Sequence, residues 1–167
     1  MKKLIRLSVF LSIIAIVAAC KDRSKATAPE NTPVTEQTET ISTSENILEI
    51  ESNDQMQYST NELKTGTGTI TLTLQHTGKM DKAVMGHNLV ILKPGTDVAA
   101  FTEKAALAKA TDYIPESEKA NIIAHTRLLS GGESDTIEFT ISEPGTYDFL
   151  CSFPGHAAMM KGKLVVE

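Results

Sequence analysis

The sequence of 167 residues has no tryptophan, only two cysteines and few aromatic residues of any kind. Its longest apolar run, residues 7–17, would rise about 16 Å as a helix, well short of a hydrocarbon core of about 30 Å. A basic stripe is also lacking, since residues 46–167 carry ten basic and sixteen acidic side chains. These absences argue against a transmembrane helix and against nucleic acid as a partner.

The N-terminal segment has the pattern of a secretory signal peptide. Basic residues precede the apolar run, and small residues follow it up to Cys20. The junction "VAAC" resembles a bacterial lipobox, so we expect residues 1–19 to be removed and Cys20 to carry lipid at its new N-terminus. The alternatives are an uncleaved anchor and a plain signal peptide with a chance cysteine. The lipidated form predicts an exported lipoprotein on the periplasmic side of a membrane or at the cell surface.

Residues 20–45 combine the predicted lipid site with a stretch rich in Thr, Ser, Pro and Glu, which indicates a disordered tether. The remaining residues, 46–167, are expected to form one domain. If Cys20 carries lipid, Cys151 has no disulfide partner within the chain. A lone thiol in an oxidising compartment is then expected to be protected, either by burial or by a metal ion.

The domain has the alternation of apolar and polar residues that is typical of half-buried strands. This pattern predicts strands at 69–75, 135–141 and 146–151, with weaker ones at 47–52, 87–93, 121–125 and 161–167. Only residues 96–110 indicate a helix, with Thr96 as a possible N-cap. Many short strands and one helix favour an all-β fold, an antiparallel β-sandwich with one helical insertion.

The stretch "CSFPGHAAMM", residues 151–160, brings a thiol, an imidazole and thioethers together near the C-terminus. Taken singly, Cys151 is typical of a buried residue, His156 of a solvated turn and Met160 of core packing. Together they supply three of the four donors that a redox-active copper ion prefers, namely a thiolate, two imidazoles and a weak axial thioether. The second imidazole has to come from elsewhere in the chain.

"MGHN", residues 85–88, together with "CSFPGHAAMM" closely resembles azurin, the blue-copper member of the cupredoxins. Residues 52–58, 84–88, 123–129 and 154–162 follow one another in azurin order at close to azurin spacing. The resemblance implies a cupredoxin-like Greek-key sandwich that holds one type 1 copper ion. The implied metal ligands are His87, Cys151, His156 and axial Met160, with the carbonyl oxygen of Gly86 as a weak contact opposite.

The resemblance also assigns residues around the ligands. Asn88 is expected to brace the ligand loops, and the backbone N–H groups of Asn88 and Phe153 to bond the Cys151 sulfur. Met159 is expected to face the apolar surface, because neighbours on a strand point to opposite sides. His76 matches a buried azurin histidine whose titration is coupled to redox state. His125 matches an exposed one.

Two positions depart from the azurin pattern. Asn46 and Thr67 stand where azurins carry a disulfide, so we expect that cross-link to be missing at some cost in stability. Leu89 stands where the common azurin motif has its tryptophan. Neither change touches the implied metal ligands.

The resemblance implies a monomeric electron carrier, not an enzyme, that cycles between Cu(I) and Cu(II). A c-type cytochrome donor and a reductase or oxidase acceptor are the implied partners, docking on an apolar patch around His156. The residues expected around that patch are Met56, Met80, Met85, Pro154, Ala158 and Met159. The alternatives are a copper-delivery protein without redox cycling, a metal-free scaffold, and zinc in the same site.

Overall fold

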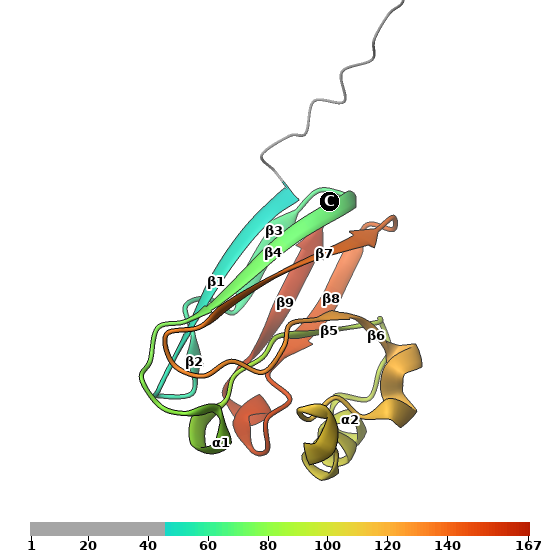
Figure 1. Cartoon of the computed structure of the whole chain (residues 1–167). Coiled ribbons are helices and arrows are strands. Elements are labelled where there is room, and N and C mark those ends of the chain that lie inside the picture. The colour runs from blue at the N-terminus through green and yellow to red at the C-terminus, as the bar shows by residue number, and fades with distance from the viewer. Residues whose placement is uncertain (1–45) are drawn as a thin grey trace, which may run out of the picture. The chain divides into compact units, whose positions relative to one another are not determined.

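Alternating apolar residues build two β-sheets that pack face to face, as the sequence predicts (Figure 1). The computed structural model describes residues 46–167. The predicted signal peptide (1–19), Cys20 and the tether (20–45) therefore lie outside the described residues. Within residues 46–167, no helix is long and apolar enough to cross a membrane.

The first sheet has four strands in the order β2-β1-β4-β7, and the second has five in the order β3-β9-β8-β5-β6. The strands of the first sheet are β1 (Ile47–Asn53), β2 (Gln57–Tyr58), β4 (Gly68–His76) and β7 (Ser134–Ile141). Those of the second are β3 (Glu62–Thr65), β5 (Val90–Leu92), β6 (Ile122–His125), β8 (Gly145–Leu150) and β9 (Lys161–Val166).

Most strand pairs are antiparallel, as expected, but each sheet also contains one parallel pair. β1 runs parallel to β4, and β3 runs parallel to β9. Between β1 and β4 the chain crosses to the other sheet to form β3, so β4 re-enters the first sheet in the direction of β1. The two-residue β2 and four-residue β3 are too short for their alternation to be read from the sequence.

The core lies between the sheets and is filled by the inward side chains of both. Leu72 and Leu74 from β4 pack with Phe149 from β8 and Leu164 from β9, all almost fully buried. Leu89, at the position where the resemblance implies a tryptophan, is also fully buried in this cluster. A smaller apolar side chain therefore completes this part of the core.

The helical insertion lies between β5 and β6, as expected, but its bounds differ. Helix α2 spans Val98–Leu107, and its N-cap is Asp97, whose carboxylate accepts from the N–H groups of Ala99 and Ala100. The expected cap, Thr96, instead donates its hydroxyl to the Lys93 carbonyl. Phe101 and Ala105 bury one face of α2 in a second apolar cluster with Val90, Leu92 and Leu150.

Shorter helical turns flank this insertion and the site. They are α1 (Lys82–Met85) and the 3₁₀ turns η2 (Lys109–Thr111), η3 (Glu116–Asn121) and η4 (His156–Ala158). Their lengths fall below what sequence periodicity can indicate. In Figure 1, α1 and α2 lie at one end of the sandwich, whereas the C-terminus and the start of β1 lie at the other.

The strand expected at 87–93 begins only at Val90. His87 makes an isolated bridge with Leu129 instead. Asn88 leaves the ladder because its carbonyl accepts from Tyr58 and its side chain bonds Ser152. His87 and Asn88 therefore lie in the loop between α1 and β5, at one end of the sandwich.

A hydrogen-bond cluster occupies the place of the missing disulfide. The Asn46 carboxamide N–H group donates to the carbonyls of Thr67 (3.2 Å) and Thr69 (3.1 Å). Its oxygen accepts from the Thr65 hydroxyl (3.0 Å) and the Gly66 N–H (3.1 Å). One side chain therefore ties the start of β1 to the turn between β3 and β4.

Replacing Asn46 with alanine is expected to lower the free energy of unfolding by about 2 kcal/mol, because four hydrogen bonds are lost at a partly buried site. Urea denaturation of the metal-free domain measures this change. Thr67→Ala is the matched control, since Thr67 contributes only its backbone carbonyl to the cluster. Equal loss in both variants would contradict the role given to the Asn46 side chain.

Candidate metal centre

Three buried side chains from two segments of the chain converge at the end of the sandwich that carries α1. They are His87 after α1, Cys151 after β8 and His156 at the start of η4. The Cys151 Sγ lies 4.0 Å from His87 Nδ1 and 3.7 Å from His156 Nδ1, and the two Nδ1 atoms are 3.2 Å apart. Among residues 46–167 this is the one group of three such donors within 4.8 Å of one another.

The loop from Cys151 to Met160 closes on itself through its backbone. The Cys151 N–H donates to the Met160 carbonyl (2.9 Å), and the Met160 N–H donates to the His156 carbonyl (2.8 Å). Gly155 has a φ of 83°, in the left-handed region that favours glycine, and lets the chain reverse between Phe153 and His156. The turn expected from the "PG" pair is therefore what brings His156 back toward Cys151.

His87 is fixed by contacts on two sides. Its backbone N–H donates to the Leu129 carbonyl (3.2 Å) and its own carbonyl accepts from Leu129 (2.8 Å). Its Nε2 lies 2.8 Å from the Asn53 carbonyl oxygen, which is only an acceptor, so Nε2 carries the proton. Nδ1 then keeps its lone pair free for a metal ion, an arrangement common for ligating histidines.

Asn88 and Ser152 join the two segments that carry His87 and Cys151. The Asn88 carboxamide donates to the Ser152 hydroxyl (2.8 Å), and its oxygen accepts from the Ser152 N–H (2.9 Å). The backbone N–H groups of Asn88 and Phe153 are directed at the Cys151 sulfur, where they lower the thiol pKa. These are the donors that the azurin resemblance implies.

Burial keeps the metal-free site uncharged. Desolvation raises the pKa of the Cys151 thiol to about 11, although the two N–H groups oppose that rise. Desolvation likewise lowers the pKa of His87 to about 4 and also lowers that of His156. A metal ion that replaces the thiol proton would supply the missing positive charge, so metal binding releases a proton.

The remaining residues assigned by resemblance lie next to these three. Met160 is fully buried whereas Met159 is 59% exposed, so the neighbouring thioethers face opposite ways as expected. The Gly86 carbonyl oxygen lies 3.9 Å from the Cys151 sulfur. A Cβ added at Gly86 would approach the Lys82 carbonyl to 2.6 Å, so this position requires glycine for close backbone approach.

The two other histidines divide as the sequence suggests. His76 is fully buried, with its ring centroid 4.4 Å from that of His87 and its Nε2 3.2 Å from the Met85 carbonyl. Its Nδ1 accepts from the Gly78 N–H (3.1 Å). His125, by contrast, is exposed on β6.

Sequence reasoning missed three residues that hold the site, namely Asn53, Tyr58 and Ser152. Asn53 and Tyr58 lie in the segment that follows azurin order, and Ser152 is the neighbour of Cys151. The sequence indicated that these segments belong to the site. The carbonyl and hydroxyl contacts themselves depend on the packing of β1, β2 and β5. Periodicity and spacing carry no information on such contacts.

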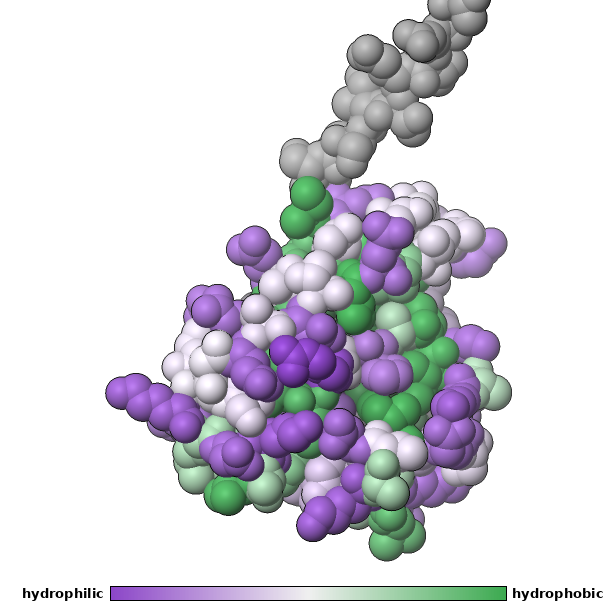
Figure 2. All heavy atoms as spheres, in the orientation of Figure 1, coloured by the Kyte–Doolittle hydropathy of each residue, from purple (hydrophilic) through white to green (hydrophobic). Residues whose placement is uncertain are grey.

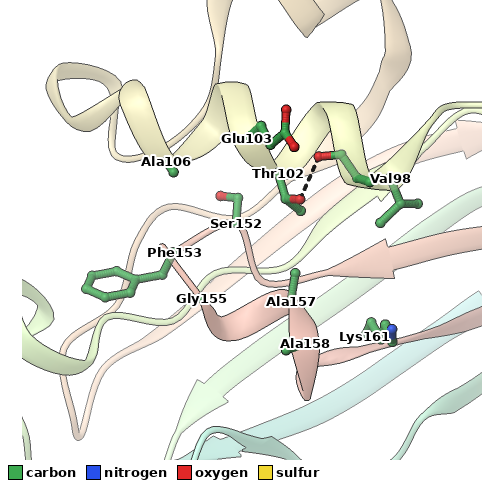
Figure 3. Close-up of a pocket in the computed structure, with 11 residues that line it drawn as sticks. Val98, Thr102, Glu103, Ala106, Ser152, Phe153, Gly155, Ala157, Ala158 and Lys161 are labelled. Carbon is green, nitrogen blue, oxygen red and sulfur yellow. Dashed lines mark hydrogen bonds between the residues drawn. The ribbon is translucent and has the colours of Figure 1, made fainter.

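Exposed apolar side chains lie at the end of the domain that carries the site. Figure 2 shows separate groups of apolar residues at the lower edge of the molecule, with hydrophilic residues between them, where Figure 1 places α1 and α2. Exposed apolar side chains on these elements include Val84 and Leu107, with Met80 and Met159 on the adjoining loops. An open groove runs between α2 and the ligand loop, lined mainly by small residues such as Ala106, Gly155, Ala157 and Ala158 (Figure 3).

Metal-free protein is expected to lose stability as the pH falls below about 6.5. The unfolded chain protonates His87 near pH 6.5, whereas the folded chain does so only near pH 4, so the unfolded state binds more protons between these values. The loss attributable to His87 is about 2 kcal/mol at pH 5 and none above pH 7. Urea denaturation at pH 7 and pH 5 measures it.

His87→Gln should flatten this pH dependence, leaving the smaller part that arises from His156. His125→Gln, which changes an exposed histidine, should retain it in full. Parallel curves for His87→Gln and the unmodified domain would show that His87 is not the group responsible.

The donor set fits copper by its chemistry. One thiolate sulfur and two imidazole nitrogens, with the buried Met160 in the same loop, are the residue types that copper prefers in redox sites, although thiolate and imidazole also bind zinc. Comparison with known proteins separates these two metals.

Residues 44–167 match the family of copper-binding proteins described as plastocyanin/azurin. The chain is 42% identical over 120 residues to Azurin-2 of Alcaligenes xylosoxydans xylosoxydans, a match that covers 69% of this chain and 92% of that one. It is 40% identical over 121 residues to the outer membrane protein H.8 of Neisseria gonorrhoeae, covering 70% of this chain and 65% of that one.

A solved structure of auracyanin from Roseiflexus castenholzii has 42% sequence identity and a TM-score of 0.65, covering 73% of this chain and 97% of that one. These likenesses extend over nearly all the described residues, and they confirm both the cupredoxin fold and copper as the cofactor. The His87, Cys151 and His156 cluster fits a single type 1 copper site. The chain belongs to the plastocyanin/azurin family of copper-binding proteins.

Proposed function

We propose that this protein carries single electrons between redox partners outside the cytoplasm. The observation that supports this best is the convergence of His87, Cys151 and His156 in a buried site. A copper ion bound there supplies a one-electron Cu(I)/Cu(II) couple. The family role is the second support.

We assign His87 Nδ1, Cys151 Sγ and His156 Nδ1 as the ligands that would hold the copper ion, with Met160 and the Gly86 carbonyl as weaker contacts. This set would fill the coordination with protein atoms and leave no position for a substrate, unlike catalytic sites that keep one open. Buried side chains exclude water from the ligands. Backbone hydrogen bonds in both ligand segments hold the donors in place, so a change of charge should move them little.

His156 is the proposed exit for the electron, because its loop adjoins the apolar end of the domain. Its ring centroid lies 4.5 Å from that of Phe153, and Pro154 and Ala158 nearby are exposed. A small apolar surface of this kind suits brief docking. The proposed partners are a c-type cytochrome donor and a reductase or oxidase acceptor, docking on a monomer. The groove of Figure 3 extends this surface along α2.

We also propose that the protein is exported and held at a membrane by lipid on Cys20, with residues 20–45 as a tether and 46–167 as the copper domain. The "VAAC" junction supports this, as does the similarity to an outer membrane protein. The described domain begins at the end of the sandwich opposite α1 (Figure 1). A tether at that end would leave the copper end free for partners.

A copper-delivery protein is the main alternative. Delivery requires a site from which copper leaves readily, and such sites are commonly exposed. The donors here are buried, with His156 only 4% exposed, which favours retention of the metal. We therefore rank electron transfer above delivery.

Addition of Cu(II) to the soluble domain should produce an intense blue thiolate-to-copper band. Cys151→Ser should abolish it, because the hydroxyl oxygen does not provide the thiolate donor. Met159→Leu is the matched control, since the exposed neighbour of Met160 should be dispensable for colour. Visible absorption measures both. A colourless domain that binds copper would contradict the assigned ligands.

Cyclic voltammetry of the blue protein separates electron transfer from delivery. Reversible one-electron waves with copper retained over repeated cycles are expected for a carrier. Loss of copper on reduction, with transfer to a competing Cu(I) chelator within seconds, would instead favour delivery.

Cys20→Ser should release the full-length protein from the membrane fraction. The lipid contributes about 0.8 kcal/mol per buried methylene, so its removal should eliminate stable membrane association. Labelling with radioactive palmitate in a bacterial host, followed by fractionation, measures both effects. Labelling that persists in the variant would rule out Cys20 as the lipid site.

A further inference from the structure

Tyr58 reaches the metal site from the edge of the first sheet. Its ring packs edge to face on Phe149, with centroids 5.7 Å apart and an interplanar angle of 64°. Phe149 is 1% exposed, so this contact anchors the tyrosine ring against the core. From there the Tyr58 hydroxyl donates a hydrogen bond to the carbonyl oxygen of Asn88.

The β1–β2 hairpin that carries Tyr58 contacts two successive residues of the site. On one side the Asn53 carbonyl accepts from His87 Nε2 (2.8 Å), and on the other Tyr58 donates to Asn88. The hairpin is held by its own register, in which Asn53 pairs with Gln57. It is also held by the Asn53 side chain, whose oxygen accepts from the Gln55 N–H (3.0 Å). The hairpin therefore forms one hydrogen bond with His87 and one with Asn88.

The peptide group between Asn88 and Leu89 is fixed from both sides. Its C=O accepts from Tyr58, and its N–H donates to the Thr126 hydroxyl (3.0 Å). Because a peptide unit is planar, bonds on both sides leave it little freedom to rotate. The preceding N–H, which belongs to Asn88, is the one directed at the Cys151 sulfur.

We propose that Tyr58 is a positioning residue that holds the Asn88 N–H on the Cys151 sulfur and thereby raises the reduction potential of the copper site. This inference rests on the proposed function. An N–H···S bond draws negative charge from the thiolate, and a less electron-rich thiolate stabilises Cu(II) less. The Tyr58 hydroxyl bonds the Asn88 carbonyl and not a proposed ligand, so its effect runs through the Asn88 backbone.

The phenol is suited to this role at every working pH. Burial raises the pKa of Tyr58 well above its usual value, and the nearby Cys151 raises it further. The hydroxyl therefore remains a hydrogen-bond donor. Its partner is a backbone carbonyl, which gives the bond a fixed direction.

The test compares two variants that each lose one hydroxyl. Tyr58→Phe removes the bond to Asn88, and Tyr147→Phe removes an equivalent bond from a buried tyrosine on β8 to the Glu143 carbonyl. Both retain the ring and its packing. Glu143 lies in the turn between β7 and β8, so the control bond is remote from the ligand loop.

In the copper-loaded protein, Tyr58→Phe is expected to lower the reduction potential and shift the blue band, whereas Tyr147→Phe should leave both unchanged. In the metal-free protein, Tyr58→Phe should accelerate backbone hydrogen exchange at Asn88 and Leu89 by about tenfold, the loss expected for one hydrogen bond. Protein-film voltammetry, visible absorption and NMR-detected exchange measure these effects.

An unchanged potential in Tyr58→Phe, or equal shifts in both variants, would overturn the inference. If the unmodified protein fails to turn blue, the proposed function fails instead. The exchange comparison in the metal-free protein still decides whether Tyr58 orders Asn88. Unaltered exchange at Asn88 and Leu89 would then overturn the positioning role independently of copper.

Discussion

The paired hydrogen bonds between Asn88 and Ser152 are the constraint on which the site depends. They join the segment after α1 to the segment after β8, and each of these segments carries a proposed ligand. Without this link, the two segments would be joined only by the β5–β8 pairing, which ends at Val90 and Leu150, and by the ligands themselves. The buried thiol and imidazoles would then have to order both loops while losing their hydration, which is costly for polar groups. The sandwich thus prepares the site before a metal ion arrives.

The prepared site is buried, and its burial opposes the ionisation of its own side chains. The same apolar surroundings that exclude water also disfavour charge on Cys151 and on the two histidines. The backbone N–H groups of Asn88 and Phe153 offset only part of that effect at the sulfur. A bound metal cation would offset this cost of burial for all three donors at once. The stability of the metal-bound form therefore rises with the affinity of the folded domain for the metal ion.

Much of the fold followed from the sequence because its central strands alternate strictly. Residues 69–75 bury every second side chain as predicted, and "SEPG" turns the chain between β7 and β8. The short strands β2 and β3 escaped prediction, since their pairing with distant segments carries no local pattern. Asp97 outcompeted Thr96 as the cap because its carboxylate reaches two N–H groups at the start of α2.

The candidate site followed from the sequence to a different extent. The azurin resemblance of "MGHN" and "CSFPGHAAMM" pointed to His87, Cys151 and His156, and these three side chains do lie together. The contacts that hold these side chains in place could not be predicted from the sequence. Asn53 acts through a carbonyl, which every residue possesses, and Tyr58 reaches Asn88 only because β2 lies beside β1. Such contacts arise from tertiary packing rather than from residue type.

The hydrogen-bond cluster of Asn46 has a consequence for how the domain matures. Since Asn46 replaces a cysteine of the usual azurin cross-link, residues 46–167 contain Cys151 as their single thiol. No intradomain pairing error can then trap the thiol required for copper, and no oxidoreductase is needed to correct one. Folding of the domain therefore does not depend on forming a disulfide, and its single thiol is left for the metal ion.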